Sequence, residues 1–336
     1  MQIVTTTIIL ISLTQYMCLY AASDLNVFNN INIFKNLTKS CVFGVTSVSM
    51  VLFTSNIPQG KFIEANKSCD FFDPSKSVFF ITHGFLAHSY WPNFDKLTFL
   101  LLKKDCTIFV LDWSNAACYN DPVIINLLGY PFAVRNTREV GDYLASYVKS
   151  VMDVCNVSLK KITLIGHSLG AHISGFAAKN LQKSNYDKIP LLIGTDPAGP
   201  SFLFNDCENR LCKTDAERVV ALHSSFLGIQ KSIAHLNLWF NNGILQPACP
   251  FFQFNCSHNI AVEYLTHTLL DNCVYVGVPI SSRIFPFLNV MPGCSSDITK
   301  KIVVDSNLFN NNYSTVGDYC VSVRSEYPYC KRKNKL

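Results

Sequence analysis

The feature that most constrains this chain is a serine between two glycines, where a strand-like run gives way to a helical one. Residues 161–181, KITLIGHSLGAHISGFAAKNL, contain this pentapeptide, GHSLG, at positions 166–170. Side chains on Gly166 and Gly170 would collide with the neighbouring strand and helix, so the turn is tight and lifts the Ser168 hydroxyl clear of the sheet. The helix N-terminus behind it favours developing negative charge. This setting predicts that Ser168 is a nucleophile rather than an ordinary turn serine.

Apolar runs of strand length alternate with helical patterns through the middle of the chain. The strand-like runs span residues 78–82, 107–112, 161–166, 189–195 and 219–225. Apolar residues spaced three and four apart from Val140 to Val151 predict an amphipathic helix, and a second helix is expected from Leu169 to Leu181. This alternation predicts an α/β fold, with a mostly parallel sheet covered by helices on both faces. Chemistry in such sheets gathers at the carboxyl ends of the strands.

A nucleophilic serine needs a base to remove its proton and a carboxylate to orient that base. The strand-like run IPLLIGT ends at Asp196, which places a carboxylate at the required edge of the sheet. Asp112 also ends a strand but precedes Ser168 in the chain. Asp206 and Asp215 lie in a loop bounded by cysteines. We therefore expect Asp196 to be the acid, against the alternative of a simple turn aspartate.

The base is expected to be a histidine that follows the acid in the chain. The candidates are His223, His235, His258 and His267. His223 lies within an apolar strand, which is typical of a core histidine, and His267 falls on a helical pattern, where a packing or surface role is the default. His258 follows Cys256 by two residues on a loop just before that helix, and a disulfide there would fix the loop. The residues alone favour His258 without excluding the others.

A tetrahedral oxyanion requires preorganised backbone donors, and removing one typically costs about 3 kcal/mol of transition-state stabilisation. One donor is expected to be the amide of Leu169, directly after the nucleophile. The second is expected from the loop after an early strand, VFFITHGF, as the N–H of Phe85 following the flexible Gly84. His83 is interpreted as a structural hydrogen-bonding residue rather than a catalyst.

The N-terminal segment reads as a secretory signal. Residues 1–23 contain no charged side chain, with an apolar core from Ile8 to Leu13 and small residues near the expected cleavage at 21–23. A basic residue near Met1 is missing from this pattern. The run is too short to span a bilayer, and no later segment supplies about 20 uninterrupted apolar residues. We expect a secreted, extracellular protein rather than a membrane anchor, with residues 24–336 forming one domain.

The cysteines point to the same compartment. Of the 14 cysteines, only Cys18 falls within the expected signal, and such numbers are tolerated in an oxidising environment. The odd remainder predicts at least one free thiol, and the absence of a CxxC pair disfavours zinc sites. Glycosylation is expected at the sequons of Asn36, Asn66, Asn156 and Asn312. Asn255 also qualifies, but its neighbourhood is expected to be buried or stapled.

The net charge of +5 is modest and spread along the chain. The closing KRKNKL is the one basic cluster, and it is interpreted as a solubilising tail that also favours anionic lipid surfaces. We expect no nucleic-acid partner and a monomeric protein.

At these residues the chain resembles the pancreatic-lipase family of α/β-hydrolases, and more closely the secreted phospholipase A1 enzymes of insect venoms. The resemblance runs from about Val78 to the C-terminus. It rests on ITHGF, LDWSNAAC, NTREVG, GHSLGAHISGFA, GTDPAGPSF, NDCENRLCKTDAERV, NNGILQPAC, CSH and SEYPYCKRK. It implies an α/β-hydrolase fold in a single domain, too short to carry the C-terminal lipid-binding β-sandwich of the larger lipases.

The same resemblance implies roles for individual residues. The implied triad is Ser168, Asp196 and His258, and the implied oxyanion donors are Phe85 and Leu169. The implied disulfides are Cys207–Cys212, Cys249–Cys256 and Cys41–Cys118. The larger lipases bind calcium through carboxylates in the loop after the acid, and here Cys212 stands where one is expected. We therefore expect no metal and no cofactor.

The segment PFFQFN between Cys249 and Cys256 is much shorter than the lid of triglyceride lipases. A short lid leaves room for a phospholipid headgroup. Its aromatic residues are Phe251, Phe252 and Phe254. They are interpreted as an apolar tip that dips into a lipid interface, with burial against the disulfide as the alternative.

Three residues depart from the family pattern around this site. Asn259 follows the expected base where these families usually carry arginine, Thr195 replaces an apolar residue before the acid, and Asn237 lies in the altered run AHLNLWFNNG. Such changes weaken activity or shift specificity.

From the resemblance and the short lid, the chain is expected to be a calcium-independent phospholipase A1 that cleaves the sn-1 acyl ester. The alternatives are a triacylglycerol or galactolipid lipase, and a lipase-like lipid-binding protein with weak activity.

Overall fold

A computed structural model describes residues 39–280, 300–310 and 313–333 of the chain. The expected signal at residues 1–23 lies outside these ranges, as do the sequons at Asn36 and Asn312. Within them, no helix is both long and apolar enough to cross a lipid bilayer.

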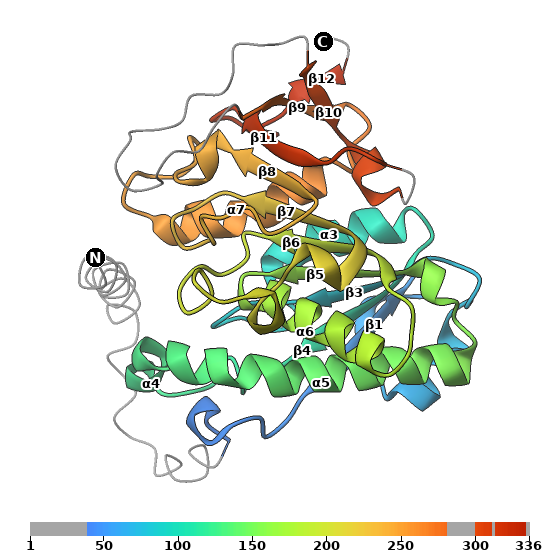
Figure 1. The fold of residues 1–336 in the computed structure, drawn as a ribbon. Coiled ribbons are helices and arrows are strands. Elements are labelled where there is room, and N and C mark those ends of the chain that lie inside the picture. Colours follow the sequence, from blue (N-terminus) through green and yellow to red (C-terminus); the bar gives the residue numbers. More distant parts are fainter. Residues whose placement is uncertain (1–38, 281–299, 311–312, 334–336) are drawn as a thin grey trace.

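A single sheet runs through the described part of the molecule (Figure 1). Its strands are β1 (Ser49–Thr54), β2 (Ile57–Phe62), β3 (Val78–Thr82), β4 (Thr107–Asp112), β5 (Ile162–His167), β6 (Ile189–Thr195), β7 (Ala216–His223), β8 (Leu236–Phe240), β9 (Cys273–Pro279), β10 (Ile302–Val304), β11 (Gly317–Ser322) and β12 (Lys331–Arg332). Their order is β10-β9-β11-β8-β7-β6-β5-β3-β4-β1-β2, with β12 paired to β9.

The central strands are parallel and the edges antiparallel. From β4 through β3, β5, β6, β7 and β8 to β11, every neighbouring pair is parallel. At one edge β1 and β2 are antiparallel, and at the other β9 is antiparallel to β10 and β11. This arrangement confirms the mostly parallel α/β sheet expected from the sequence. The segment beyond residue 270 supplies four further strands, β9 to β12, to the same sheet.

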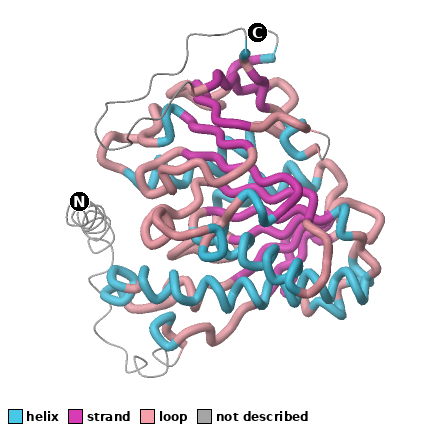
Figure 2. Tube along the Cα trace, viewed as in Figure 1, coloured by secondary structure: helices cyan, strands magenta, loops and turns pink. Residues whose placement is uncertain are grey.

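Helices cover both faces of the sheet, as the tube view in Figure 2 shows. The α-helices are α3 (Pro92–Leu102), α4 (Val123–Leu128), α5 (Tyr130–Cys155), α6 (Leu169–Lys183) and α7 (Phe254–His267). Short 3-10 helices are η1 (Cys41–Phe43), η2 (Ala65–Lys67), η3 (Cys69–Phe71), η4 (Leu159–Lys161), η5 (Cys207–Asn209), η6 (Lys213–Asp215), η7 (Asn241–Gly243) and η9 (Ser306–Phe309). Two apolar cores result, one beneath α5 and α6 and one beneath α3 and α7.

The long helix α5 follows from its apolar stripe. Val140, Leu144, Val148 and Val151 are fully buried, which confirms the predicted amphipathic helix. The helix begins at Tyr130, ahead of that stripe. Pro131 lies in its first turn, where proline is tolerated, so it does not interrupt the start of the helix. It ends at Asn156, whose left-handed conformation (φ 56°, ψ 36°) forms the C-cap.

Disulfides staple the loops around this scaffold. The described pairs are Cys41–Cys118, Cys69–Cys155, Cys207–Cys212, Cys249–Cys256 and Cys273–Cys330. All three pairs implied by the family resemblance are among them. Cys106 remains a free thiol, in agreement with the odd number of cysteines after the expected signal.

Candidate active site

Ser168 occupies a strained turn between β5 and α6. Its backbone angles, φ 56° and ψ −121°, lie in a region that side-chain-bearing residues rarely adopt. A Cβ on Gly166 would lie 2.3 Å from the carbonyl oxygen of Gly170 in α6. A Cβ on Gly170 would lie 2.2 Å from the carbonyl oxygen of Thr82 in β3. The helix therefore excludes a side chain at Gly166 and the strand excludes one at Gly170, for the reason expected from the sequence.

Asp196 lies directly after β6, fully buried, and its carboxylate is held by several donors. Oδ1 accepts the backbone N–H groups of Ser224 at 2.7 Å and Ser225 at 3.2 Å. Oδ2 accepts the hydroxyl of Ser225. A Cβ on Gly228 would lie 2.3 Å from Oδ1, so only glycine fits beside the acid. The sequence alone did not point to Ser224, Ser225 and Gly228, which lie just beyond β7.

His258 and Asp196 form the central contact of the site. Nδ1–H of His258 donates a hydrogen bond of 2.6 Å to Oδ2 of Asp196, and the hydroxyl of Ser225 lies 3.4 Å from the same nitrogen. The side chain of His258 is buried at 9% exposure. With Nδ1 committed to the acid, Nε2 is the nitrogen available to accept a proton.

The prediction that His258 lies on a loop before its helix is wrong. Helix α7 begins at Phe254, so His258 lies in its second turn. The prediction took the helix from the pattern AVEYLTHTLL, which begins at Ala261, and overlooked the anchoring of the first turn. There, Cys256 is held by its disulfide and the Ser257 carbonyl accepts the hydroxyl of Ser224 at 2.6 Å. The rigidity expected from a disulfide-fixed loop is supplied by a helix.

Ser168 and His258 face a common cavity of about 170 Å³. Phe85, Tyr130 and Leu227 also line it. Among the described contacts, the hydrogen bonds of the His258 ring lead to the acid and to Ser225, and none joins it to Ser168 Oγ. Such bonds commonly tighten only when substrate binds. The structure thus joins two of the expected triad by a hydrogen bond and places the third on the same cavity wall.

Of the two expected oxyanion donors, Phe85 lines the cavity and Leu169 directly follows the lining residue Ser168. Leu169 is the first residue of α6, so its N–H has no acceptor within the helix. The N–H that follows Phe85, that of Leu86, is already bonded to the carbonyl of Ala117 at 3.0 Å. A Cβ on Gly84 would lie 2.8 Å from Cβ of Ser168. Glycine at that position therefore allows the Phe85 loop to approach the serine closely.

His83 fixes the peptide group that carries the Phe85 N–H. Its Nδ1–H donates to the carbonyl of Gly84 at 2.9 Å, and its Nε2 accepts the backbone N–H of Trp113 at 3.2 Å. The ring stacks on the Trp113 indole. Burial lowers the pKa of His83 to about 4, so the ring is neutral near pH 7. The interpretation of His83 as a structural residue agrees with these contacts.

The sequence of the chain matches a family of known proteins over most of its length. Residues 29–329 of the chain match the lipase family.

This chain belongs to the lipase family.

It is an ester hydrolase, and its relatives include insect enzymes. It is 40% identical to a phospholipase A1 of Dinoponera quadriceps over 89% of this chain and 80% of that protein. It is 42% identical to a phospholipase A1 of Vespa velutina (78% and 84%) and 34% identical to one of Solenopsis invicta (94% and 93%). Among solved structures it aligns with MGS-M1, an alpha/beta hydrolase enzyme, at 14% identity and a TM-score of 0.32, covering 55% of this chain and 67% of that one.

Two of the departures from the lipase pattern meet at His167. The ring of His167 lies between Trp91, at a centroid distance of 5.0 Å, and His258, at 4.6 Å. Its Nδ1 hydrogen-bonds the carbonyl of Thr195 at 3.0 Å and the Thr195 hydroxyl at 3.2 Å, and the side chain of Asn259 hydrogen-bonds the same ring. Burial, followed by the proximity of His258, lowers the pKa of His167 well below its usual value. Thr195 and Asn259 thus act on the residue that packs against the expected base.

The third departure lies away from the cavity. The Asn237 side chain accepts the backbone N–H groups of Ile233 and Ala234 and bonds the ring of His223 at 3.2 Å. The remaining base candidates are also committed elsewhere. Nδ1 of His235 accepts the N–H of Val219 at 3.0 Å. Nδ1 of His267 bonds the Pro328 carbonyl at 2.8 Å. None of these rings lines the cavity beside Ser168.

The aromatic residues between Cys249 and Cys256 differ in their exposure to solvent. Phe251 and Phe252 are exposed at 69% and 68%. Phe254 is half-buried, with its ring 6.4 Å from that of Phe226. The alternative, burial against the disulfide, does not hold for Phe251 and Phe252, and insertion of an apolar tip into lipid stays a prediction.

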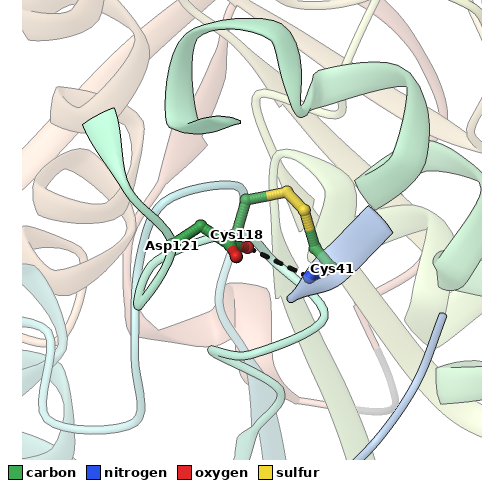
Figure 3. A group of neighbouring side chains, drawn as sticks. All are labelled: Cys41, Cys118 and Asp121. Atoms are coloured by element: carbon green, nitrogen blue, oxygen red, sulfur yellow. Dashed lines mark hydrogen bonds between the residues drawn. A yellow bond between two sulfur atoms is a disulfide. The ribbon is translucent and has the colours of Figure 1, made fainter. Parts of the chain in front are cut away.

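One group of metal-ligating side chains is found in the described part of the chain, and its atoms are already engaged. Cys41 and Cys118 are joined in a disulfide, and the carboxylate of Asp121 accepts the N–H of Cys41 at 3.0 Å (Figure 3). A disulfide removes the thiolates that bind metals. The independence from metal expected from the sequence stays a prediction.

The loop around Cys212, where the larger lipases are expected to hold calcium, packs against a lysine ammonium of helix α6. Nζ of Lys179 lies 2.5 Å from Oδ1 of Asp215 and 2.9 Å from the carbonyl of Arg210. Oδ2 of Asp215 accepts the N–H of Cys212 at 2.8 Å. The positive charge that neutralises this buried carboxylate thus comes from the chain itself.

Proposed function

We propose that this chain is a secreted phospholipase A1 that hydrolyses the sn-1 acyl ester of phospholipids through Ser168, Asp196 and His258. The observation that carries the proposal is the buried 2.6 Å hydrogen bond between His258 and Asp196 on the wall of the cavity that Ser168 shares. This is the relationship between base and acid that serine hydrolysis requires. The names of the insect relatives support the substrate class.

In the acylation step, Ser168 Oγ attacks the carbonyl carbon of the ester while Nε2 of His258 takes the hydroxyl proton. Asp196 stabilises the imidazolium that forms. The carbonyl oxygen becomes an oxyanion that accepts hydrogen bonds from the N–H groups of Leu169 and Phe85. When the intermediate collapses, the bond between the acyl carbon and the glycerol oxygen breaks. The glycerol oxygen takes the proton from Nε2, and the lysophospholipid that carries it leaves.

In the deacylation step, water enters the cavity and attacks the acyl carbon, with His258 taking its proton. The second tetrahedral intermediate is held by the same two amides. Its collapse breaks the bond to Ser168 Oγ, which recovers its proton from Nε2. The fatty acid is released and the enzyme returns to its starting state.

Several features support a phospholipid over a triacylglycerol. The short segment between Cys249 and Cys256 leaves the cavity open, which suits a substrate with a bulky headgroup. Secretion is supported by the signal-like residues 1–23 and by the disulfides of the described part of the chain. A single copy would dock peripherally on a phospholipid surface, and Asn66 and Asn156, both exposed, would carry glycans.

The test is hydrolysis of phosphatidylcholine that carries different acyl chains at its two positions, with the released fatty acid identified by mass spectrometry. The proposal predicts release of the sn-1 chain and its loss in Ser168→Ala. Ser184→Ala, at the exposed C-cap of α6, serves as the matched control and should retain full activity. Turnover of trioleoylglycerol alone would favour a neutral lipase. Lipid binding without turnover would favour a binding protein. Phosphatidylcholine hydrolysis that survives Ser168→Ala would rule out the mechanism.

A further inference from the structure

Exposed apolar side chains surround the cavity that contains Ser168. On one side is α4, where Ile124 and Leu128 are exposed at 68% and 65%. Two residues after α4 comes Tyr130, which lines the cavity and donates its hydroxyl to the carbonyl of Pro200 at 3.0 Å. Helix α4 is therefore connected through a single residue to the cavity wall.

The other sides of the cavity show the same pattern. Phe204, exposed at 83%, follows the lining residue Pro200 within one short loop. Phe226, half exposed, precedes the lining residue Leu227. The exposed tip of the Cys249–Cys256 segment leads into Asn255, which also lines the cavity. We call the apolar rim the set Ile124, Leu128, Phe204, Phe226, Phe251 and Phe252.

The segments that line the cavity or carry the apolar rim are almost without charge. They span residues 84–94, 113–134, 195–205, 222–230 and 241–262. Asp121 and Asp196 are the only Asp, Glu, Lys or Arg residues within them, although the chain has 28 Lys and Arg and 23 Asp and Glu. Asp196 is buried against His258, and the carboxylate of Asp121 is bonded to the N–H of Cys41. No cationic side chain of these segments is available to attract an anionic surface.

The opposite end of the molecule has a different character. Helix α5 starts beside α4 and crosses the molecule (Figure 1), and its 26 residues span about 39 Å. At its far end Asn156 is exposed, and the Cys69–Cys155 disulfide holds the exposed sequon Asn66 nearby. A surface that contacts the apolar rim therefore leaves both sequons in water.

We propose that the apolar rim docks on a lipid surface through apolar insertion alone, with α4 as an anchor beside the active-site entrance. The proposal rests on the proposed function for the identity of the substrate. Transfer of apolar side chains from water to lipid is favourable and independent of headgroup charge. Because the rim carries no cation, its fitting partner is a zwitterionic surface such as phosphatidylcholine. The basic residues Lys331 and Arg332 lie in β12, which pairs with β9 near the far edge of the sheet (Figure 1).

The experiment measures partition of the full chain onto phosphatidylcholine vesicles by flotation, in a Ser168→Ala background that leaves the vesicles intact. Ile124→Lys places a charge on the exposed face of α4. Val154→Lys, in the last turn of α5, is the matched control, because Val154 is an exposed aliphatic residue at the opposite end. Binding is repeated at low and high salt and with phosphatidylserine added. Thermal unfolding shows that both variants remain folded.

We expect Ile124→Lys to weaken vesicle binding about tenfold or more, because burial of one aliphatic side chain is lost, while Val154→Lys binds like its parent. Salt and phosphatidylserine should change binding little. In a separate assay with Ser168 intact, Ile124→Lys should hydrolyse a monomeric short-chain ester at the parental rate, which distinguishes loss of docking from loss of catalysis.

Several results would overturn the proposal. Unchanged vesicle binding by Ile124→Lys would do so, as would binding that depends on phosphatidylserine and disappears at high salt. If Ile124→Lys lost monomeric-ester hydrolysis to the same extent as vesicle binding, α4 would act on the active site itself. Dissociation of a dimer by Ile124→Lys, with vesicle binding retained, would assign the rim to a second copy of the chain. If the unsubstituted protein, with Ser168 intact, failed to hydrolyse any ester, that result would instead count against the proposed function.

Discussion

The Nδ1–H of His83 donates a hydrogen bond of 2.9 Å to the carbonyl of Gly84. That carbonyl and the N–H of Phe85 belong to one planar peptide group, so the bond sets the direction in which the N–H points. A buried, neutral ring held by Trp113 thus orients a group expected to stabilise the oxyanion. In the proposed mechanism, this contact connects a buried residue outside the cavity to the energy of the transition state.

Replacing His83 by leucine should therefore lower kcat about tenfold to a hundredfold with little change in KM, because a misdirected oxyanion donor loses part of its contribution. His83→Asn retains an N–H near the position of Nδ1 and should keep more of the activity. Steady-state kinetics on a soluble ester measure both. His235→Gln, on a ring outside the cavity, is the control. A rise in KM at unchanged kcat would contradict this role.

Ser225→Ala should lower kcat about tenfold, because Asp196 loses a hydroxyl donor while its two backbone donors remain. Ser232→Ala removes an exposed serine hydroxyl that bonds Asp318 and should leave kcat unchanged. The measurement is the rate of ester hydrolysis at saturating substrate. Full activity in Ser225→Ala would show that the two backbone N–H groups alone hold the acid.

Lys179→Met should reduce the free energy of unfolding by about 3–5 kcal/mol, because it leaves the buried carboxylate of Asp215 unpaired. The double variant Lys179→Met/Asp215→Leu should recover much of that loss, because neither charge remains buried. Urea denaturation of the four proteins gives the coupling. If the double variant is as unstable as the sum of the single variants, the pair is not coupled as the contacts imply.

Acid should destabilise the fold through its buried histidines. Burial lowers the pKa of His83 to about 4, that of His172 to about 3 and that of His267 to about 4, from 6.5 in the unfolded chain. Between those values the unfolded state binds more protons than the folded state, so stability is fully present above pH 6.5 and is lost as pH falls toward 4. Each such histidine contributes a loss of about 2 kcal/mol at pH 5.

Urea denaturation at pH 7 and pH 5 measures this loss. His267→Gln, which removes a titrating ring bonded to the Pro328 carbonyl, should make the difference between the two pH values smaller. A pH dependence that is unchanged in this variant would show that His267 does not titrate between pH 4 and 6.5.

The sequence predicted the parallel sheet and the turn at Ser168 because each depends on local patterns. The apolar runs of β3, β4 and β6 match their predicted boundaries. The glycines around Ser168 are required because a side chain there would collide with the backbone of β3 or α6. The start of α7 was missed because its first turn is held by a disulfide and by contacts from distant loops rather than by its own pattern.

The supporting residues were missed for a related reason. Ser225 reaches Asp196 from a loop 29 positions away in the chain, and no spacing rule connects the two. Thr195 and Asn259 were noticed as departures, but their common contact with His167 exists only in the folded chain. Contacts between loops at the same edge of the sheet cannot be read from periodicity.

The most direct test of the triad is labelling with a fluorophosphonate, an ester mimic that reacts only with an activated serine, followed by peptide mapping. We expect one labelled peptide that contains Ser168, and loss of that label when His258 is replaced by glutamine or Asp196 by asparagine. Labelling of another serine, or labelling of Ser168 at an unchanged rate after His258→Gln, would contradict this expectation.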